Sequence, residues 1–139
     1  MSSDTNNPIK SNGPMKSLII LTRFNTDPYI YNKFDTEKNY SYLMPVGLGY
    51  ISSVLKKNGH NVTILNLNHR KGLVEELIKD ELAGKEYDFV FTGGVSIYYP
   101  HMRDYIQYIR EASPLSRIVI GGGLISAQPE IMFNLLKPE

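Results

Sequence analysis

The sequence predicts an α/β fold of the flavodoxin-like (Rossmann-like) type, with three layers in which helices cover both faces of a parallel sheet. Four short apolar segments alternate with four longer segments whose apolar residues recur at helical spacing. Glycine or proline stands at most of the boundaries between these segments. Strict alternation of strand and helix favours parallel strands joined by right-handed crossovers, and we expect the strand order 2-1-3-4.

The first half of the chain supplies two strands and two helices. The apolar run in residues 17–22 predicts a strand buried on both faces, and residues 62–67 are the second strand. A helix over residues 45–59 begins at proline and ends at Asn-Gly, and residues 72–84 form the second helix. Residues 25–42 form a long loop rich in tyrosine. The inward-facing positions expected for the first helix are Leu48, Ile51, Val54 and Leu55.

The second half of the chain repeats the same pattern. Residues 89–92 and 117–120 are short and apolar, and we expect them to be the third and fourth strands. The third helix is expected to begin at Pro100 and the fourth at Pro129, because proline fits the first turn of a helix. The inward-facing positions expected for the third helix are Met102, Tyr105, Ile106 and Ile109.

The chain is expected to hold one domain behind a leader. Residues 1–16 are polar and predict a disordered leader, and residues 17–139 form the domain. In the flavodoxin-like order a fifth strand follows the fourth helix, so we interpret the domain as truncated at its C-terminus or as a minimal version. Either way its fourth strand has an open edge. Since open edges recruit other strands, we expect self-association, aggregation or marginal stability.

The composition argues against several classes of binding partner and excludes all chemistry that needs cysteine. Fifteen Lys and Arg against fourteen Asp and Glu give a net charge of +1, so no strong field is available for nucleic acid or an anionic membrane. The chain has no cysteine, which excludes disulfides, thiolate metal sites, iron–sulfur clusters and a cysteine nucleophile on it. No apolar run is long enough to span a bilayer and no signal peptide is evident, so the expected location is cytoplasmic.

No catalytic or metal-binding constellation stands out among the residues. The three histidines, His60, His69 and His101, have no metal-ligand spacing and no clustered carboxylates. His60 lies in a turn and is expected to be structural. No nucleophile and base are paired by the sequence, so we assign no catalytic residue.

A ligand site is expected beyond the carboxyl ends of the strands. In an open parallel sheet, ligands bind where the strand order reverses, which in the order 2-1-3-4 is between the first and third strands. Three loops should converge there, namely Arg23–Tyr29, Gly93–Tyr99 and Gly121–Ser126.

Two of these loops are rich in glycine. Glycine removes side chains where a planar or phosphate-bearing ligand approaches the backbone, and the alternative is that it only allows tight turns. Neither loop matches the dinucleotide fingerprint or the P-loop. The candidate glycines are Gly93, Gly94, Gly121, Gly122 and Gly123.

Hydroxyl and aromatic side chains complete the candidate site. Ser96 either hydrogen-bonds a ligand or stabilises its own loop, and Ser126 either contacts the ligand or caps the following helix. Tyr98 belongs to a set of ten tyrosines concentrated in the loops. These rings would form a lid over a flat ligand or pack the loops onto the domain.

Three segments together resemble the N-terminal cobalamin-binding domain of cobalamin-dependent radical SAM enzymes. Residues 45–62 (PVGLGYISSVLKKNGHNV) resemble the opening P-x-G-L-x-Y of that family with its later G-H-x-V. Residues 87–100 (YDFVFTGGVSIYYP) resemble its D-x-V-G-x-S segment with the closing Y-P. Residues 118–130 (IVIGGGLISAQPE) resemble its I-V-x-G-G segment with the closing P-E. The resemblance covers roughly residues 17–139.

The resemblance implies that cobalamin lies against the candidate glycines, with Ser96, Tyr98 and Ser126 in reach. The sequence departs from the family pattern at Gly93, where the family has serine, and at Gly123 and Leu124, where it has Pro-His. No D-x-H-x-x-G follows the first strand, so no histidine of that motif would reach the cobalt.

The family's catalytic chemistry would lie on another domain. The radical SAM core needs a cysteine motif that this chain lacks, so the resemblance places the iron–sulfur cluster and S-adenosylmethionine on a partner domain. The chain by itself is then a binding module, not a catalyst. Two alternatives remain open: a cofactor-free interaction domain of the same fold, and a small flavin- or nucleotide-binding protein.

Overall fold

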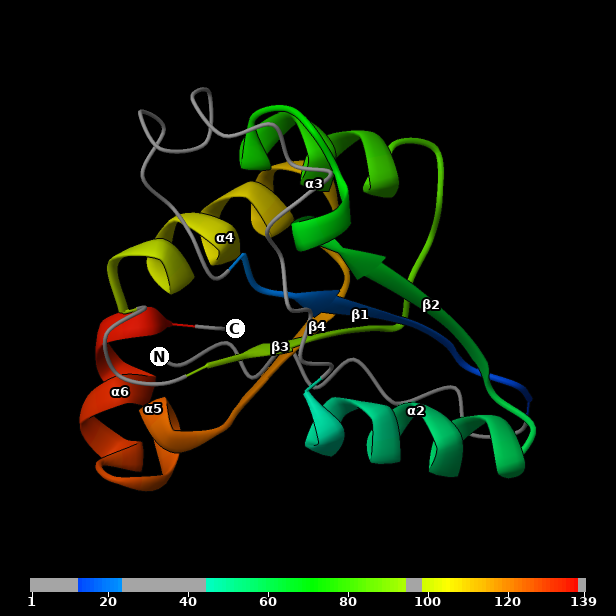
Figure 1. Cartoon of the computed structure of the whole chain (residues 1–139), viewed down its shortest axis with the longest axis horizontal. Helices are drawn as coiled ribbons and strands as arrows, with labels where there is room; N and C mark the ends of the chain where they lie inside the picture. Colours follow the sequence, from blue (N-terminus) through cyan, green and yellow to red (C-terminus); the bar gives the residue numbers. More distant parts are fainter. Residues whose placement is uncertain (1–12, 24–44, 95–98, 138–139) are drawn as a thin grey trace, which may run out of the picture.

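The structure is a computed structural model that describes residues 13–23, 45–94 and 99–137. The strands it contains are β1 (Lys16–Leu21), β2 (Asn61–Asn66), β3 (Phe89–Gly93) and β4 (Arg117–Gly121). The helices are α2 (Val46–Lys57), α3 (Val74–Leu82), α4 (Tyr99–Ala112), α5 (Gly123–Ser126) and α6 (Pro129–Leu136), with a 3₁₀ turn, η1 (Leu67–His69). Strands and helices alternate along the chain as the sequence predicts (Figure 1).

The four strands form one parallel sheet in the order β2-β1-β3-β4, which confirms the predicted topology. β1 is paired on both sides, and its residues from Ser17 to Leu21 are buried. A central strand covered on both faces needs apolar side chains in both directions, which explains its continuous apolar run. The strand order reverses between β1 and β3, where the site was expected.

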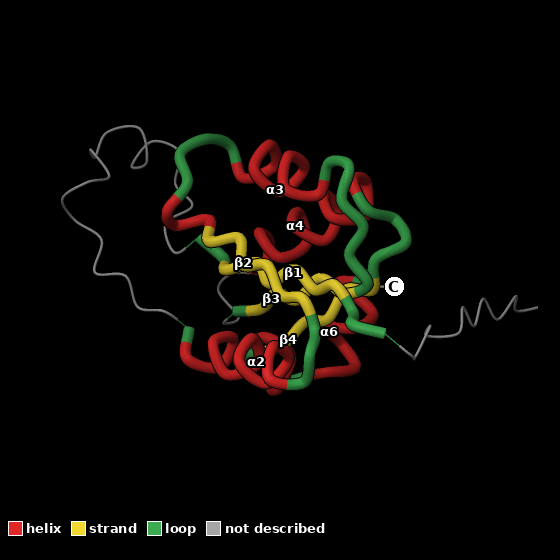
Figure 2. The backbone as a smooth tube through the Cα atoms, turned by 90° about the vertical axis from the view of Figure 1, so that its right-hand side faces the viewer, coloured by secondary structure: helices red, strands yellow, loops and turns green. Residues whose placement is uncertain are grey.

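Helices lie on both sides of the sheet. α3 and α4 lie together on one side, and α2 and α6 lie on the other (Figure 2). The main core fills the space between the sheet and the α3/α4 layer. The predicted inward face of the third helix is confirmed, because all four of its positions are buried. The strand and helix residues at the centre of this core include Leu18, Ile20, Leu65, Val90, Ile78, Met102 and Ile109.

The face of α2 that meets the sheet differs from the predicted one. Ser52 is its buried residue, and Leu48 and Leu55 are half-buried beside it. Ile51 and Val54 were expected inside, but their side chains are 40% and 55% exposed. The prediction was wrong at these two positions because α2 carries apolar residues around most of its circumference, so periodicity alone did not select one face.

Several boundaries also differ from the prediction. β1 begins at Lys16, the last residue of the predicted leader, and the third helix begins at Tyr99 instead of Pro100. Residues 121–126 were expected to be a loop, whereas Gly121 ends β4 and Gly123–Ser126 form α5. A single helical turn of four residues is too short to leave a periodic signal in the sequence.

Candidate functional site

The carboxyl ends of β1, β3 and β4 meet at one place on the sheet edge. Gly93, the last residue of β3, pairs with Gly121, the last residue of β4. On the other side of β3, the Thr22 hydroxyl donates a hydrogen bond to the Gly93 carbonyl at 3.4 Å. The structure thus brings together the ends of the loops that the sequence placed at the site, as far as its described residues extend.

Main-chain contacts between glycines hold the two loops against each other. The Gly94 amide donates to the Gly121 carbonyl at 3.3 Å, and the Leu124 amide donates to the Gly94 carbonyl at 3.0 Å. A Cβ atom on Gly93 would collide with the Gly121 carbonyl oxygen, and one on Gly122 would lie 2.8 Å from the Gly94 oxygen. Since real contacts of this kind do not occur, glycine at Gly93 and Gly122 is required by backbone packing.

Gly122 also has a backbone conformation that other residues avoid. Its φ is 91° and its ψ is −175°, a region that is essentially restricted to glycine. This conformation turns the chain sharply from β4 into α5, whose first residue is Gly123. The fold therefore accounts for Gly122 without any ligand.

Gly121 has no such structural explanation. Among the residues that the structure describes, nothing lies within 4 Å of a Cβ atom added at Gly121, and the φ of Gly121 is not positive. Strand alternation shows where that open space lies. Ile118 points into the α3/α4 core, so Gly121, three residues further along β4, faces the opposite side of the sheet, where α2 lies. Among the described residues, the space beside these paired strand ends is therefore open at Gly121.

The candidate hydroxyls contribute differently. The Ser126 hydroxyl donates to the Gly122 carbonyl at 3.1 Å and so stabilises the α5 turn. It does not cap the next helix, whose N-cap is Gln128. Ser126 is exposed, which leaves its oxygen accessible. Ser96 and Tyr98 lie outside the residues that the structure describes.

A buried arginine at the end of β1 was missed by the sequence analysis. Arg23 is 6% exposed and donates to three main-chain carbonyls, those of Leu67 (3.1 Å), Gly72 (3.0 Å) and Arg70 (2.8 Å). The Asn68 amide group adds a bond to the Thr22 carbonyl at 3.0 Å. These bonds fasten the β2–α3 connection to the end of β1. The sequence feature that could have indicated this role is an arginine directly after the predicted buried strand.

We expect Arg23→Met to lower the free energy of unfolding by about 3 kcal/mol, because several carbonyls lose their charged donor in a buried setting. Denaturant unfolding followed by circular dichroism measures this loss. The matched control is Lys71→Met, an exposed position in the same connection, which should change stability by less than about 0.5 kcal/mol. Equal effects of the two variants would contradict the structural role of Arg23.

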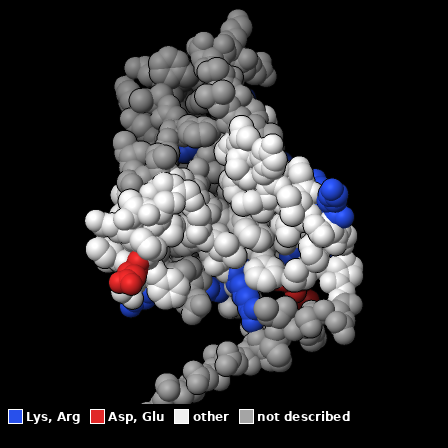
Figure 3. All heavy atoms as spheres, turned by 90° about the horizontal axis from the view of Figure 1, so that it is seen from below, with Lys and Arg blue, Asp and Glu red and all other residues white. Residues whose placement is uncertain are grey.

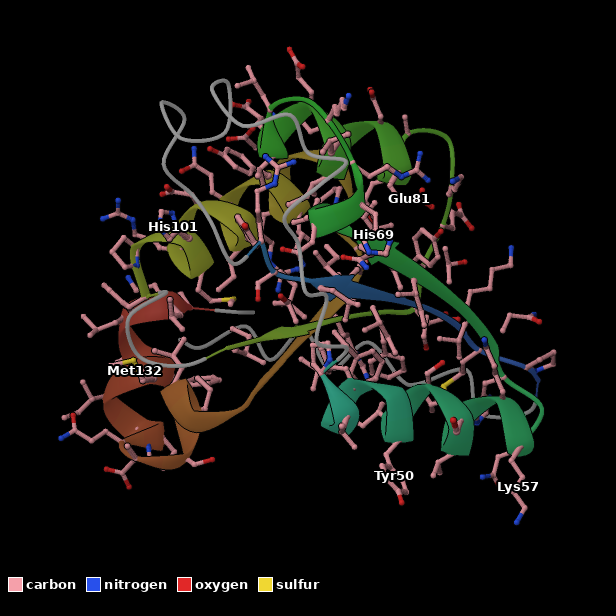
Figure 4. The ribbon with its side chains drawn as sticks, viewed as in Figure 1. Tyr50, Lys57, His69, Glu81, His101 and Met132 are labelled. Carbon is pink, nitrogen blue, oxygen red and sulfur yellow. The ribbon has the colours of Figure 1, made fainter. Side chains whose placement is uncertain are left out.

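The histidines do not form a site. The His60 Nδ1 atom accepts a hydrogen bond from the Met15 amide at 3.3 Å, which confirms its structural role in the turn before β2. His69 lies in η1 and His101 in the first turn of α4, well apart in Figure 4. Within residues 13–23, 45–94 and 99–137, no three His, Cys, Asp or Glu side chains are grouped to hold a metal ion.

Shifted pKa values occur away from the glycines, on the surface of α3 and α4. The Lys79 ammonium lies 2.6 Å from Glu75 and 2.7 Å from Glu111, and so joins the two helices. These hydrogen bonds, first the one to Glu111, raise the pKa of Lys79. The bond from Lys79, followed by one from Gln107, lowers the pKa of Glu111.

The sign of this shift predicts an acid-dependent contribution to stability. A lowered carboxyl pKa stabilises the fold above the unfolded pKa, and the stabilisation is lost as pH falls through the folded pKa. We expect the free energy of unfolding of Glu111→Gln to be slightly below that of wild type at neutral pH. At acid pH the two values should be equal, because Glu111 of the wild type is then protonated as well. Chemical unfolding across this range tests the difference. Glu86→Gln, at an exposed position, should match wild type throughout; a constant deficit for Glu111→Gln would refute the ion-pair explanation.

Taken together, a parallel α/β sheet with glycine-lined strand ends beside an open space defines an α/β ligand-binding domain. Comparison with protein families identifies which one. The model of the B12 binding domain matches residues 33–136, most of the chain, so this chain belongs to the B12-binding domain family.

Comparison with solved structures agrees on the fold. The radical S-adenosylmethionine methyltransferase TsrM from Kitasatospora setae, solved with cobalamin and a 4Fe–4S cluster, aligns with a TM-score of 0.68 at 16% identity over 89% of this chain. The same enzyme with its tryptophan substrate and a SAM analogue gives a TM-score of 0.68, also at 16% identity, over 88%. The chain spans 22% of the length of each of these solved chains.

Two further comparisons complete the description. A search of curated proteins found no match. Among the helices of the described segments, none has the length and apolar character needed to cross a membrane.

Proposed function

We propose that this chain is a cobalamin-binding module that seats the corrinoid at the carboxyl edge of its sheet. The proposed contacts are Gly93, Gly94, Ser96, Tyr98, Gly121, Gly122, Gly123 and Ser126. Membership of the B12-binding domain family supports the identity of the ligand. The observation that carries the proposed position is Gly121, whose missing side chain leaves open space that the fold itself does not need.

The residues fit such a group by shape. Gly121 presents bare main chain next to its pairing partner Gly93, so a wide planar ring or its nucleotide tail can approach the strand end closely. Exposed Ser126 at the rim can donate to or accept from a polar ligand group. Cobalamin supplies methyl-transfer chemistry through its cobalt when bound. The chain's own residues bind and orient it.

The proposal includes a catalytic partner. The two solved structures compared above are of one radical SAM methyltransferase, TsrM, and the matching region is 22% of its chain. By analogy, a radical SAM core on another segment or chain would carry the iron–sulfur cluster and S-adenosylmethionine and act on the substrate. We place the system in the cytoplasm, as the sequence predicts.

Titration of the purified chain with hydroxocobalamin tests this function. The expected result is a saturable change in the visible spectrum of the corrinoid and a rise in melting temperature. At a hundredfold excess over the dissociation constant, binding should add about 2.7 kcal/mol to the free energy of unfolding. A response to flavin mononucleotide instead would favour the flavin-binding alternative. No response to either ligand would leave the cofactor-free interaction domain.

A further inference from the structure

The main chain that enters β1 is held by side chains from the turns before both neighbouring strands. The Met15 amide donates a hydrogen bond at 3.3 Å to the Nδ1 atom of His60, which directly precedes β2. The next amide, that of Lys16, donates at 2.7 Å to the carboxylate of Asp88, which directly precedes β3. Two consecutive amides therefore have titratable side chains as their acceptors.

The same two turns also bind the carbonyls of these residues. The Asn61 amide donates to the Met15 carbonyl at 2.9 Å, and the Asp88 amide donates to the Lys16 carbonyl at 2.8 Å. Each turn thus binds one residue of the entering chain at both its amide and its carbonyl. We call Met15, Lys16, His60 and Asp88 the entry clamp. Met15 precedes the first paired residue of β1, so a loss of its contacts does not require the sheet to open.

The entry clamp needs both of its side chains in their unprotonated forms. An imidazole nitrogen that accepts from an amide must keep its lone pair, whereas a protonated ring carries hydrogens on both nitrogens and can only donate. The bond to the Asp88 carboxylate is strengthened by the charge of its acceptor, so protonation of this carboxyl group weakens it. Imidazoles take up protons at higher pH than carboxylates do. Acidification therefore breaks the bond to His60 first and weakens the bond to Asp88 later.

We infer that the entry clamp makes the attachment of the chain before β1 sensitive to pH. At neutral pH the unprotonated His60 ring holds the Met15 amide. When the ring takes up a proton, two donors face each other, the hydrogen bond is lost, and Met15 separates from the turn before β2. The rest of β1 stays in place, because Ser17–Leu21 are buried in the sheet. Since the folded arrangement requires the unprotonated ring, its stabilisation is present at neutral pH and is lost as the pH falls.

The charged groups near His60 lie at the ends of the elements that meet at the entry clamp. The face that carries α2 shows few charged side chains (Figure 3). The charged residues at these ends are Lys56 and Lys57 on α2, Lys16 on β1, Asp88 before β3 and Arg117 on β4. The chain's other two histidines lie at the carboxyl end of the sheet, His69 after β2 and His101 at the start of α4. A response of the entry clamp in the imidazole range is therefore assigned to His60.

Hydrogen exchange of the whole chain, followed by NMR without cobalamin, tests the inference independently of the proposed function. As the pH is lowered from about 7.5 to about 5, the protection factor of the Met15 amide should fall about 10-fold, in step with the titration of the His60 ring in the same sample. The amide of Ile19, a fully buried residue in the middle of β1, should keep its protection. A fall shared by Ile19 would mean that the whole domain loosens, and would overturn the inference of a local attachment.

Two variants of His60 separate its protonation from its contacts. His60→Asn keeps an uncharged acceptor near the position of Nδ1, so the Met15 amide should stay protected at both pH values. His60→Leu removes the acceptor, so this amide should be poorly protected at both. The matched control is His101→Asn, at the carboxyl end of the sheet, which should respond to pH like wild type.

Circular dichroism of each variant shows whether it is folded, and the wild-type titration decides the inference by itself if a variant is not. Constant protection of the wild-type Met15 amide while the His60 ring titrates would overturn the inference. So would a pH response that persists in folded His60→Asn, or one that disappears in folded His101→Asn.

Discussion

Gly121→Val should abolish or strongly weaken cobalamin binding while the domain stays folded. The added side chain enters open space, and φ at this position is compatible with any residue, so the free energy of unfolding should change by less than about 1 kcal/mol. The same side chain occupies the proposed seat of the ligand. Overpacking of this kind costs about 1–3 kcal/mol, which corresponds to a loss of affinity of roughly 10- to 100-fold.

The measurement is a hydroxocobalamin titration of wild type and variant, with thermal unfolding of both proteins with and without the ligand. Gly13→Val serves as the control, because Gly13 also has open space around it but precedes β1, at the opposite end of the sheet. It should bind like wild type. Undiminished binding by Gly121→Val would place the corrinoid elsewhere.

Gly122→Val, one residue further along, should instead lower the stability of the fold itself, with or without cobalamin. The new Cβ atom would lie 2.8 Å from the Gly94 carbonyl oxygen, at a φ of 91°. We expect a loss of about 3 kcal/mol or more from backbone strain and displacement of the β3 loop. Cobalamin should not restore the lost stability in full, because the strain is present in both the free and the bound protein.

Thermal unfolding of the two variants side by side separates the roles of these neighbours. Gly122→Val should melt well below wild type in the absence of ligand, and Gly121→Val close to it. If Gly122→Val melted like wild type and lost only the cobalamin-dependent shift, Gly122 would act through its proposed ligand contact alone and the conformational explanation would fail.

The sheet could be predicted from the sequence because its signals are local and redundant. Residues 17–22 form a largely continuous apolar run, as a strand covered on both faces requires. The strands at 89–92 and 117–120 are also short apolar runs. Once four strands and four helices alternate, the handedness of the crossovers leaves few possible orders. The observed order β2-β1-β3-β4 is the flavodoxin-like one among these, as expected.

The site was only partly predictable because its details depend on contacts between distant segments. In the sequence, Gly121 and Gly122 look equivalent. In the structure, a Cβ atom added to Gly121 would have free space among the described residues, whereas one added to Gly122 would collide with Gly94. The role of Arg23 depends on carbonyls more than forty residues away, which no local pattern encodes. Ile51 and Val54 were misplaced for a related reason, since the rotation of α2 is decided by its packing on the sheet.

The position of β1 has a consequence for how the chain is made. Of the described strands, β1 is made first, but its partners are β2 and β3, and its contact to Asp88 before β3 spans 72 residues. One edge of this buried apolar strand therefore stays unpaired until β3 has been synthesised. Pairings of such long sequence separation slow folding. We expect the nascent chain to depend on chaperones until β3 has emerged, and the amides of β1 to be the last to exchange with solvent once it has folded.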